Sequence, residues 1–326
     1  YATWAVRYAL LNNPIAGRGR AATAAAEAIA LLESAGHQVR EGRSKRAGHI
    51  AEMSAALAED VDRLLALGGD GSLREAAAGL LASGEAGRVA LGVLPLGTGN
   101  VVAREAGLPL DPVAAARGLD RAEEWRIDVG WARAEGGSEE ELFLAMAGFG
   151  YDAAVAERVD RARSVAGSFG ARWYRRSADT LYGCIAASEM VRPRPARFAV
   201  EIDGVEASPS AAALVASNVC TYGKGMEMVP GAAADDGVLG YQLRERGAPW
   251  ATAASLVAAQ LRLTPPRWAA RTGEARCVTV RTQGGPSFPW QLDGDPMGRA
   301  ASVELRLEPG ALTLLRANGS GGPDAR

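Results

Sequence analysis

The residues best able to do chemistry lie in two glycine-rich segments, each following an apolar run. Residues 67–73 read Leu-Gly-Gly-Asp-Gly-Ser-Leu, and residues 95–100 read Pro-Leu-Gly-Thr-Gly-Asn. Glycines let a backbone approach a ligand where a Cβ atom would clash, and the N–H groups of such a turn and of the following helix bind anions. Asp70 lies among these donors. Because a carboxylate does not attract phosphate, we interpret Asp70 as a group that handles a proton or a metal ion, and the combination predicts phosphoryl transfer.

Regular elements must position these turns. The apolar run 61–67 fits a buried strand, and residues 72–83 fit the helix that follows it. A similar alternation fills the first 125 residues, with strands expected at 9–11, 38–40 and 89–94 and helices at 20–34 and 47–57. This pattern predicts a parallel sheet with helices on both faces and binding loops at the carboxyl ends of its strands.

Composition excludes several classes of function. The 326 residues are enough for two domains, and a formal charge of -2 gives no overall field that would attract nucleic acid. Three widely spaced cysteines and two histidines argue against a disulfide framework, a zinc site or a histidine-based triad. We expect no signal peptide and no membrane-spanning helix, and a cytoplasmic protein.

The texture of the sequence changes near residue 126. Short apolar runs at 142–147, 197–202, 211–217, 239–243, 278–281 and 301–307 are separated by Gly, Pro and charged turns. This spacing predicts a mainly antiparallel sheet domain over 126–305, interrupted by a helical insertion at 151–190. The Gly/Ser-rich residues 318–326 are expected to form a flexible tail.

A series of motifs spanning about residues 9–297 resembles the diacylglycerol kinase and sphingosine kinase family of lipid kinases, and most of all its soluble bacterial members. In chain order these are residues 12–17 (Asn-Asn-Pro-Ile-Ala-Gly), 68–72 with Glu75, 95–100, 126–130 (Arg-Ile-Asp-Val-Gly), 230–232 leading to 235–237 (Asp-Asp-Gly), and 291–296 (Gln-Leu-Asp-Gly-Asp-Pro). The resemblance implies a three-layer α/β nucleotide-binding domain over 1–125, to which residues 306–317 return. It also implies a β-sandwich-like lipid domain over 126–305, with the cleft between the two.

The chain departs from the family pattern at several positions. Ser72 stands where the family usually has Thr, and Arg74 where it often has Asn. Val101 replaces an Asp found in most bacterial members, and Asp295 replaces Glu. No reactive group is removed outright, but these changes leave the lipid substrate open.

The resemblance implies that ATP is bound by residues of the first domain. The nucleotide contacts expected from it are Asn13, Gly17, Ser44 (or His49), Gly69, Gly71, Ser72, Gly97, Thr98, Gly99, Asn100 and Arg172. Each also has a structural alternative, such as a strand-ending turn, a flexible loop or a solvated loop residue. The Ser72 hydroxyl is expected to cap the helix, and Glu75 fits a capping box with it.

The resemblance also implies the reacting carboxylates. The base that accepts the proton of the lipid hydroxyl is expected at Asp293, Asp295 or Asp70. Mg²⁺ is expected at Asp70 and, as a structural ion, at Asp236, and Asp128 matches the family's acidic residue near the interdomain hinge. The alternative for the late motif is a hairpin turn between 290–292 and 301–305.

Two segments are candidates for peripheral contact with a membrane. The insertion 151–190 carries six arginines with interleaved aromatic residues, and residues 249–268 begin Pro-Trp and end Pro-Pro-Arg-Trp. The alternatives are a solvated basic helix and a buried amphipathic helix, the second of which we favour for 249–268. A homodimer is a further hypothesis.

The resemblance therefore predicts an ATP- and Mg²⁺-dependent kinase that phosphorylates the hydroxyl of a lipid, diacylglycerol first of all, to give phosphatidic acid. The alternatives are a sphingoid-base or other lipid-alcohol kinase, an NAD kinase, and a nucleotide- or lipid-binding regulator without catalytic activity. The Pro-led loop 95–100 argues against NAD kinase.

Overall fold

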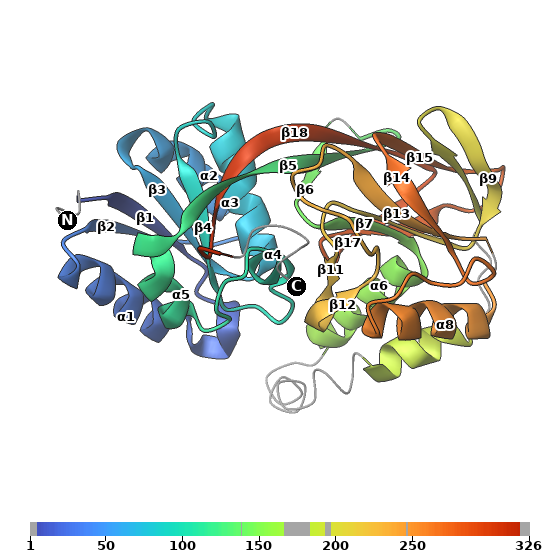
Figure 1. Ribbon diagram of the computed structural model, residues 1–326, viewed down its shortest axis with the longest axis horizontal. Coiled ribbons are helices and arrows are strands. Elements are labelled where there is room, and N and C mark those ends of the chain that lie inside the picture. Colours follow the sequence, from blue (N-terminus) through green and yellow to red (C-terminus); the bar gives the residue numbers. More distant parts are fainter. Residues whose placement is uncertain (1–4, 138, 166–182, 193–196, 246, 320–326) are drawn as a thin grey trace. The chain divides into compact units, whose positions relative to one another are not determined.

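The computed structural model describes residues 5–137, 139–165, 183–192, 197–245 and 247–319 (Figure 1). The chain divides into two compact units. The first unit comprises residues up to Val129, Gly223–Gly225 and the chain from Pro309 onward, and the second comprises Gly130–Tyr222 and Met226–Glu308. Two long strands, β5 (Glu123–Ala134) and β18 (Ser302–Arg316), contribute residues to both.

The first unit is an α/β fold around parallel strands in the order β2-β1-β3-β4-β18. Helix α1 packs with α5, and α2 packs with α3, as two pairs (Figure 1). The strands are β1 (Arg7–Asn12), β2 (Gln38–Arg43), β3 (Arg63–Gly68) and β4 (Ala90–Pro95), and the helices are α1 (Ala21–Ser34), α2 (His49–Leu57), α3 (Asp70–Ala82), α4 (Val101–Glu105) and α5 (Pro112–Gly118). Single 3₁₀ turns lie at η1 (Ala16–Gly19), η2 (Ala58–Asp60), η3 (Leu119–Arg121) and η4 (Gly223–Gly225).

The apolar patterns explain this arrangement. Every residue of β4 is buried and five of the six residues of β3 are, as expected for central strands covered on both faces. The small residues of α1, such as Ala24 and Ala28, pack against Leu10 and Leu65 of the sheet. In β18, Leu314 lies opposite Leu91 of β4 in parallel.

The second unit is built from two layers of mainly antiparallel strands. One sheet has the order β14-β13-β10-β7-β16-β17, and the other contains β18-β15-β8-β9, with β5 beside β18 and β6 beside β5. The strands are β6 (Glu141–Phe143), β7 (Met146–Gly150), β8 (Phe198–Ile202), β9 (Val205–Ala211), β10 (Ala213–Ser217), β11 (Thr221–Tyr222), β12 (Met226–Glu227), β13 (Leu239–Arg244), β14 (Arg271–Ala275), β15 (Cys277–Thr282), β16 (Phe288–Leu292) and β17 (Asp295–Ala300). The unit also contains helices α6 (Tyr151–Val165) and α8 (Pro249–Gln260), and residues 183–190 are helical.

The core of this second unit joins the two sheets. Phe198 of β8 packs between Phe149 and Phe288 of the other sheet, with ring centroids 6.4 and 5.3 Å away. Aromatic contacts of this kind add to the apolar area that the sheets bury. The predicted fold class, an α/β unit followed by a β-rich, sandwich-like one, is therefore confirmed.

Several predicted elements have different bounds in the structure, and three of these differences lie at residues of the predicted sites or their supports. Residues 142–147 were expected to form one strand, but β6 and β7 are separate, and residues 144 and 145 link them. The turn after β16 leads into β17 at Asp295, so the second arm of the hairpin is 295–300 and not 301–305. Helix α3 begins at Asp70, two residues before its expected start.

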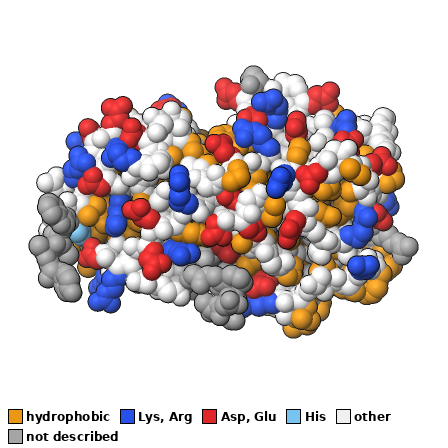
Figure 2. Space-filling view, turned by 45° about the horizontal axis from the view of Figure 1, so that its top comes forward, with side chains coloured by type: hydrophobic (Ala, Val, Ile, Leu, Met, Phe, Trp, Pro, Cys, Tyr) orange, Lys and Arg blue, Asp and Glu red, His pale blue; other side chains and the backbone are white. Residues whose placement is uncertain are grey.

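The surface agrees with the near-zero net charge. Acidic and basic side chains are interspersed over the face that Figure 2 shows. Within the described part of the chain, no helix is long and apolar enough to cross a bilayer.

Candidate active site

The two glycine-rich turns meet at the carboxyl ends of β3 and β4. The Leu96 N–H donates to the Gly68 carbonyl over 2.7 Å, and a Cβ atom added to Gly97 would lie 2.6 Å from the Gly69 Cα. Real Cβ atoms do not come this close to backbone, so position 97 requires glycine, and a Cβ atom on Gly69 would lie a tight 3.1 Å from the Gly97 Cα. The backbones of the two turns are thus in direct contact.

The segment after β1 joins the same edge. Asn13 donates from Nδ2 to the Ser72 hydroxyl over 3.0 Å, and its backbone N–H donates to the Leu67 carbonyl over 3.2 Å. Gly17, in η1, lies against the Leu96 side chain. The Ser44 N–H donates to the Asn12 carbonyl over 2.9 Å. Four strand ends therefore meet here, the usual place for a ligand in an open α/β sheet.

The caps of the helices differ from the prediction. Gly69 is the N-cap of α3, so Ser72 lies inside the first turn and accepts from Asn13 instead of capping the helix. The Glu75 carboxylate accepts from the Ile50 N–H over 3.3 Å. Ile50 lies in the first turn of α2, so Glu75 binds a backbone donor of another helix and not one of α3. The capping box was therefore wrong. The first N–H groups of α3, including those of Gly71 and Ser72, have no partner within the helix, which suits an anion.

The loop 97–100 is closed by Asn100. Its side chain accepts from the Gly97 N–H and donates to the Gly97 carbonyl, both over 3.0 Å, and Asn100 is 7% exposed. Its amide therefore shapes the loop, while Thr98 and Gly99 form the tip. Asp70 is held beside this loop, because its Oδ1 accepts from the Val102 N–H over 3.2 Å at the start of α4.

The number of carboxylates near Asp70 determines which kind of metal ion would fit there. Within the described ranges, no group of three His, Cys, Asp or Glu side chains is placed to hold a metal ion. One carboxylate suits Mg²⁺, which usually takes one or two protein carboxylates and completes its shell with substrate phosphates and water. Asp70 fits that role. Asp236 is exposed and accepts from the Val238 N–H over 3.0 Å, so it forms a turn and offers one carboxylate for a structural ion.

In the second unit, the Asp293 carboxylate accepts hydrogen bonds from backbone N–H groups. Its Oδ1 accepts from the Ala145 and Met146 N–H groups over 2.8 and 2.9 Å, and its Oδ2 accepts from the Leu144 N–H over 2.9 Å. The carboxylate thus holds the link between β6 and β7. Asp295 follows as the first residue of β17, partly exposed and opposite Leu292.

A buried carboxylate in the same unit was not predicted. Asp152, in the first turn of α6, is 7% exposed, and burial raises the pKa of its carboxyl, although hydrogen bonds from Tyr222 and Gln291 and the charge of Arg244 oppose that rise. A Cβ atom on Gly148 would overlap Asp152 Oδ2. The glycines at 148 and 150, directly before the helix, were the sequence signal.

Two other predicted residues have different surroundings. Asp128, on β5, is 2% exposed and accepts from the Gly310 N–H of β18 over 2.7 Å. Arg172 lies outside the described residues. Asp70 and its neighbours belong to the first unit. Asp152, Asp293 and Asp295 belong to the second unit.

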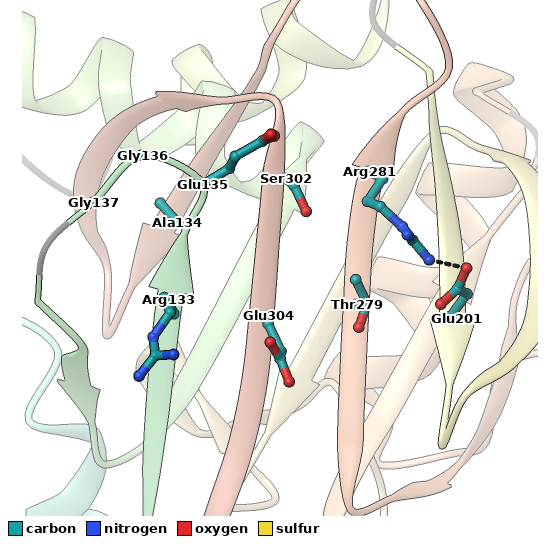
Figure 3. A pocket seen from close by; sticks show the side chains of 10 residues that line it. All are labelled: Arg133, Ala134, Glu135, Gly136, Gly137, Glu201, Thr279, Arg281, Ser302 and Glu304. Atoms are coloured by element: carbon teal, nitrogen blue, oxygen red, sulfur yellow. Dashed lines mark hydrogen bonds and ion pairs between the residues drawn. The ribbon is translucent and has the colours of Figure 1, made fainter.

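A shallow polar pocket of about 490 Å³ lies elsewhere on the second unit (Figure 3). It is lined by residues of β5, β8, β15 and β18, among them Arg133, Glu304 and the ion pair of Arg281 with Glu201. Charges of both signs face it, so it has no preference for an anionic ligand. None of the predicted site residues lies in it.

Both units of the chain match families of known proteins. Residues 7–132 match the diacylglycerol kinase catalytic domain, and residues 145–316 match the YegS C-terminal NAD kinase beta sandwich-like domain. The chain is 34% identical over 234 residues to a diacylglycerol kinase of Mycobacterium tuberculosis, with 70% of each protein covered. It is 31% identical over 262 residues to a probable lipid kinase YegS-like protein of Pseudomonas fluorescens, with 79% of each covered.

The fold has solved counterparts. A diacylglycerol kinase structure from Bacillus anthracis matches with a TM-score of 0.75 over the full length of both chains, at 20% identity. This likeness concerns the fold, whereas the sequence matches span both units. The chain therefore belongs to the diacylglycerol kinase-like family of lipid kinases, enzymes that use ATP.

Proposed function

We propose that this lipid kinase transfers the γ-phosphoryl group of ATP to the hydroxyl of diacylglycerol and so forms phosphatidic acid. The observation that carries the proposal is the direct backbone contact of the two glycine-rich turns beside Asp70. The Mycobacterium tuberculosis relative, named a diacylglycerol kinase, supports the choice of lipid. A sphingoid base or another lipid alcohol is the alternative substrate.

The first unit binds the nucleotide in this proposal. The N–H groups of the first turn of α3 point toward the phosphates, and the dipole of the helix favours their negative charge. The Asn13–Ser72 hydrogen bond and the Asn100 amide hold the two walls of the cradle. Thr98 and Gly99, at the loop tip, supply further polar contacts to ATP.

Two carboxylates have different tasks. Asp70 would hold Mg²⁺, and the ion would supply positive charge that offsets the negative charge of the reacting phosphates. Asp295 accepts the proton of the lipid hydroxyl as that oxygen bonds to phosphorus and ADP leaves. Asp293 keeps the turn in place through its backbone contacts.

The test is phosphoryl transfer from labelled ATP to mixed micelles that offer diacylglycerol, a sphingoid base and ceramide. Label in diacylglycerol, lost in Asp70→Asn, supports the proposal. The matched control is Asp62→Asn, an exposed carboxylate of the same unit paired with Arg7. Label in another lipid overturns the substrate, and ATP binding without label in any lipid favours the regulator.

We also propose that the enzyme is a cytoplasmic protein that reaches its lipid from a membrane surface through α8. This helix buries small residues, among them Ala251, Ser255 and Ala259. Two of its large apolar residues face outward instead, Trp250 and Val257, which are 54% and 57% exposed, and Leu261 directly after the helix is 61% exposed. Leu256, in contrast, packs partly buried against the core. We expected a buried amphipathic helix here, and the outward apolar face contradicts that expectation.

The residues around α8 favour a bilayer as its partner. Trp250 packs against the half-exposed Trp268 with ring centroids 5.2 Å apart, and tryptophan pairs of this kind suit the membrane interface. Residues 249–273 contain three arginines and no Asp or Glu. Two of the arginines pair with acids outside this stretch, Arg262 with Glu227 and Arg271 with Glu245, so the excess positive charge is small.

Sedimentation with vesicles of phosphatidylcholine and phosphatidylglycerol tests this face. Trp250→Ser should reduce the bound fraction most, and Val257→Ser should reduce it less. Val205→Ser, at a valine of β9 that is 70% exposed, should leave it unchanged. Equal binding by the Val257 and Val205 variants would contradict the proposal, and a dimer of the wild type that Trp250→Ser dissociates would assign the face to a second copy.

A further inference from the structure

A chain of hydrogen bonds connects the buried Asp152 to the turn that carries Asp295. Gln291, 1% exposed on β16, donates from Nε2 to Asp152 Oδ2 over 2.5 Å and accepts from the Gly294 N–H at Oε1 over 2.6 Å. Tyr222 donates its hydroxyl to the other carboxylate oxygen of Asp152. All four groups belong to the second unit.

The direction of each hydrogen bond in this chain follows from chemistry. The Gly294 N–H can only donate, so the Gln291 oxygen must face it and the Gln291 amide nitrogen must face Asp152. An ionised carboxylate can only accept, which suits both the Gln291 amide and the Tyr222 hydroxyl. The Gly294 N–H therefore determines the orientation of the buried Gln291 amide, and the Asp152 carboxylate accepts from the nitrogen of that amide.

We propose that Asp152 and Gln291 are positioning residues: they hold the Gly294 amide and thereby the orientation of Asp295. The turn is then fixed at two consecutive residues, since the Asp293 carboxylate binds the backbone of 144–146 and the Gly294 N–H binds Gln291. Asp295 follows directly. The inference rests on the proposed function for the catalytic meaning of Asp295, and on geometry alone for the fixing of the turn.

Exchange of the Gly294 amide hydrogen tests the geometry without any assay of activity. In Gln291→Met the amide loses its acceptor, so its exchange should accelerate by about tenfold or more. Gln242→Met is the matched control, because Gln242 is also buried in this unit and its side-chain amide donates to the Met228 carbonyl. Equal protection of Gly294 in wild type and Gln291→Met would overturn the proposal.

A reciprocal exchange of the two side chains tests the catalytic role. Gln291→Glu places two carboxylates against each other. In Asp152→Asn the amide oxygen can still accept from the Gln291 amide, while the amide nitrogen faces the Tyr222 hydroxyl, which can accept. Gln291→Glu should therefore lower kcat by about 10–100-fold with KM for ATP unchanged, and Asp152→Asn should stay within about threefold of wild type. The double variant D152N/Q291E restores the pattern, because the new Asn donates to the new Glu, which still accepts from the Gly294 N–H.

We expect the double variant to recover kcat to within about threefold of wild type. A merely structural role would lower stability in all three variants and would give no such recovery. A loss of kcat in Gln291→Glu that persists in the double variant, or a loosened Gly294 amide with unchanged kcat, would overturn the positioning role. A wild type that transfers no phosphoryl group contradicts the proposed function, while the exchange measurement still reports on the turn.

Discussion

Two Asp-Gly turns of this protein look alike in sequence and differ in what their carboxylates do. Asp70 accepts a backbone N–H at the start of α4, among the N–H groups of the first turn of α3. Asp293 accepts three backbone N–H groups and adopts a left-handed φ of 52°. The first carboxylate faces donors that suit a phosphate, and the second is used by its own fold. An Asp-Gly motif thus has a role only in combination with the donors around it.

The largest expected effect is on kcat, and it distinguishes the role of Asp295 from that of Asp293. If Asp295 is the base, Asp295→Asn should lower kcat by about 10²–10⁴-fold and leave the free energy of unfolding nearly unchanged. Asp295→Glu, which restores the family's residue, should be at least as active as wild type. The checks are steady-state kinetics and urea unfolding; full activity in Asp295→Asn would exclude it as the base.

For Asp293, the main effect should be on stability. Asp293→Ala removes the acceptor of three backbone N–H groups, so the free energy of unfolding should fall by about 3 kcal/mol. Asp203→Ala is the control, because Asp203 also has a positive φ of 50° and accepts from two backbone N–H groups, but at an exposed turn. Equal losses in the free energy of unfolding would mean that the hydrogen bonds from residues 144–146 to Asp293 stabilise the fold no more than those at the exposed turn of Asp203.

The contact between the glycine turns gives the next effect. Gly97→Ala must push the two turns apart, since its Cβ would meet the Gly69 backbone, and kcat/KM for ATP should fall by about 10²-fold. At Gly118 a Cβ would have nothing within 4 Å, so Gly118→Ala should be neutral. Unchanged ATP kinetics in Gly97→Ala would separate the turn contact from nucleotide binding.

The buried Asp152 should give a pH-dependent difference in stability. Because burial raises its pKa in the folded state, the folded protein holds the proton over a range where the unfolded chain has lost it. Its contribution to stability is therefore present below about pH 4 and is lost as pH rises from there to the raised pKa, at up to about 1.4 kcal/mol per pH unit. Tyr222, Gln291 and Arg244 all face this carboxyl and oppose the rise.

Urea unfolding of wild type and Asp152→Asn over this range checks the sign. The difference in free energy of unfolding should change with pH in favour of the variant as pH increases, on top of a constant offset from the altered hydrogen bonds. A constant difference at every pH would show that Asp152 has an ordinary pKa.

The smallest effect concerns the bond between Asn13 and Ser72. Ser72→Ala leaves the Asn13 amide without its acceptor and should cost about 1 kcal/mol of stability. Ser72→Thr keeps the hydroxyl and should be nearly neutral. Chemical denaturation measures the free energy of unfolding of both variants. Equal losses in Ser72→Ala and Ser72→Thr would show that the hydroxyl group does not contribute to stability.

The sequence predicted elements better than it predicted partners. The glycine-rich turns, the strands before them and the alternation of strands and helices follow from local patterns, because burial and turn chemistry are written into neighbouring residues. The link at residues 144 and 145 did not follow from the sequence, since it exists only because Asp293, far along the chain, binds its backbone. The caps failed for the same reason, because Glu75 caps a different helix.

By itself, the sequence determined the class of the two units, the phosphate-binding turns and the family, because these depend on residues close together in the chain. Only the tertiary structure decided which carboxylates are occupied by backbone, which apolar residues of α8 face outward, and that Asp152 lies behind the late turn. Each of these depends on contacts between segments distant in sequence. A hydrogen bond needs both partners at about 3 Å, and local pattern specifies only one of them.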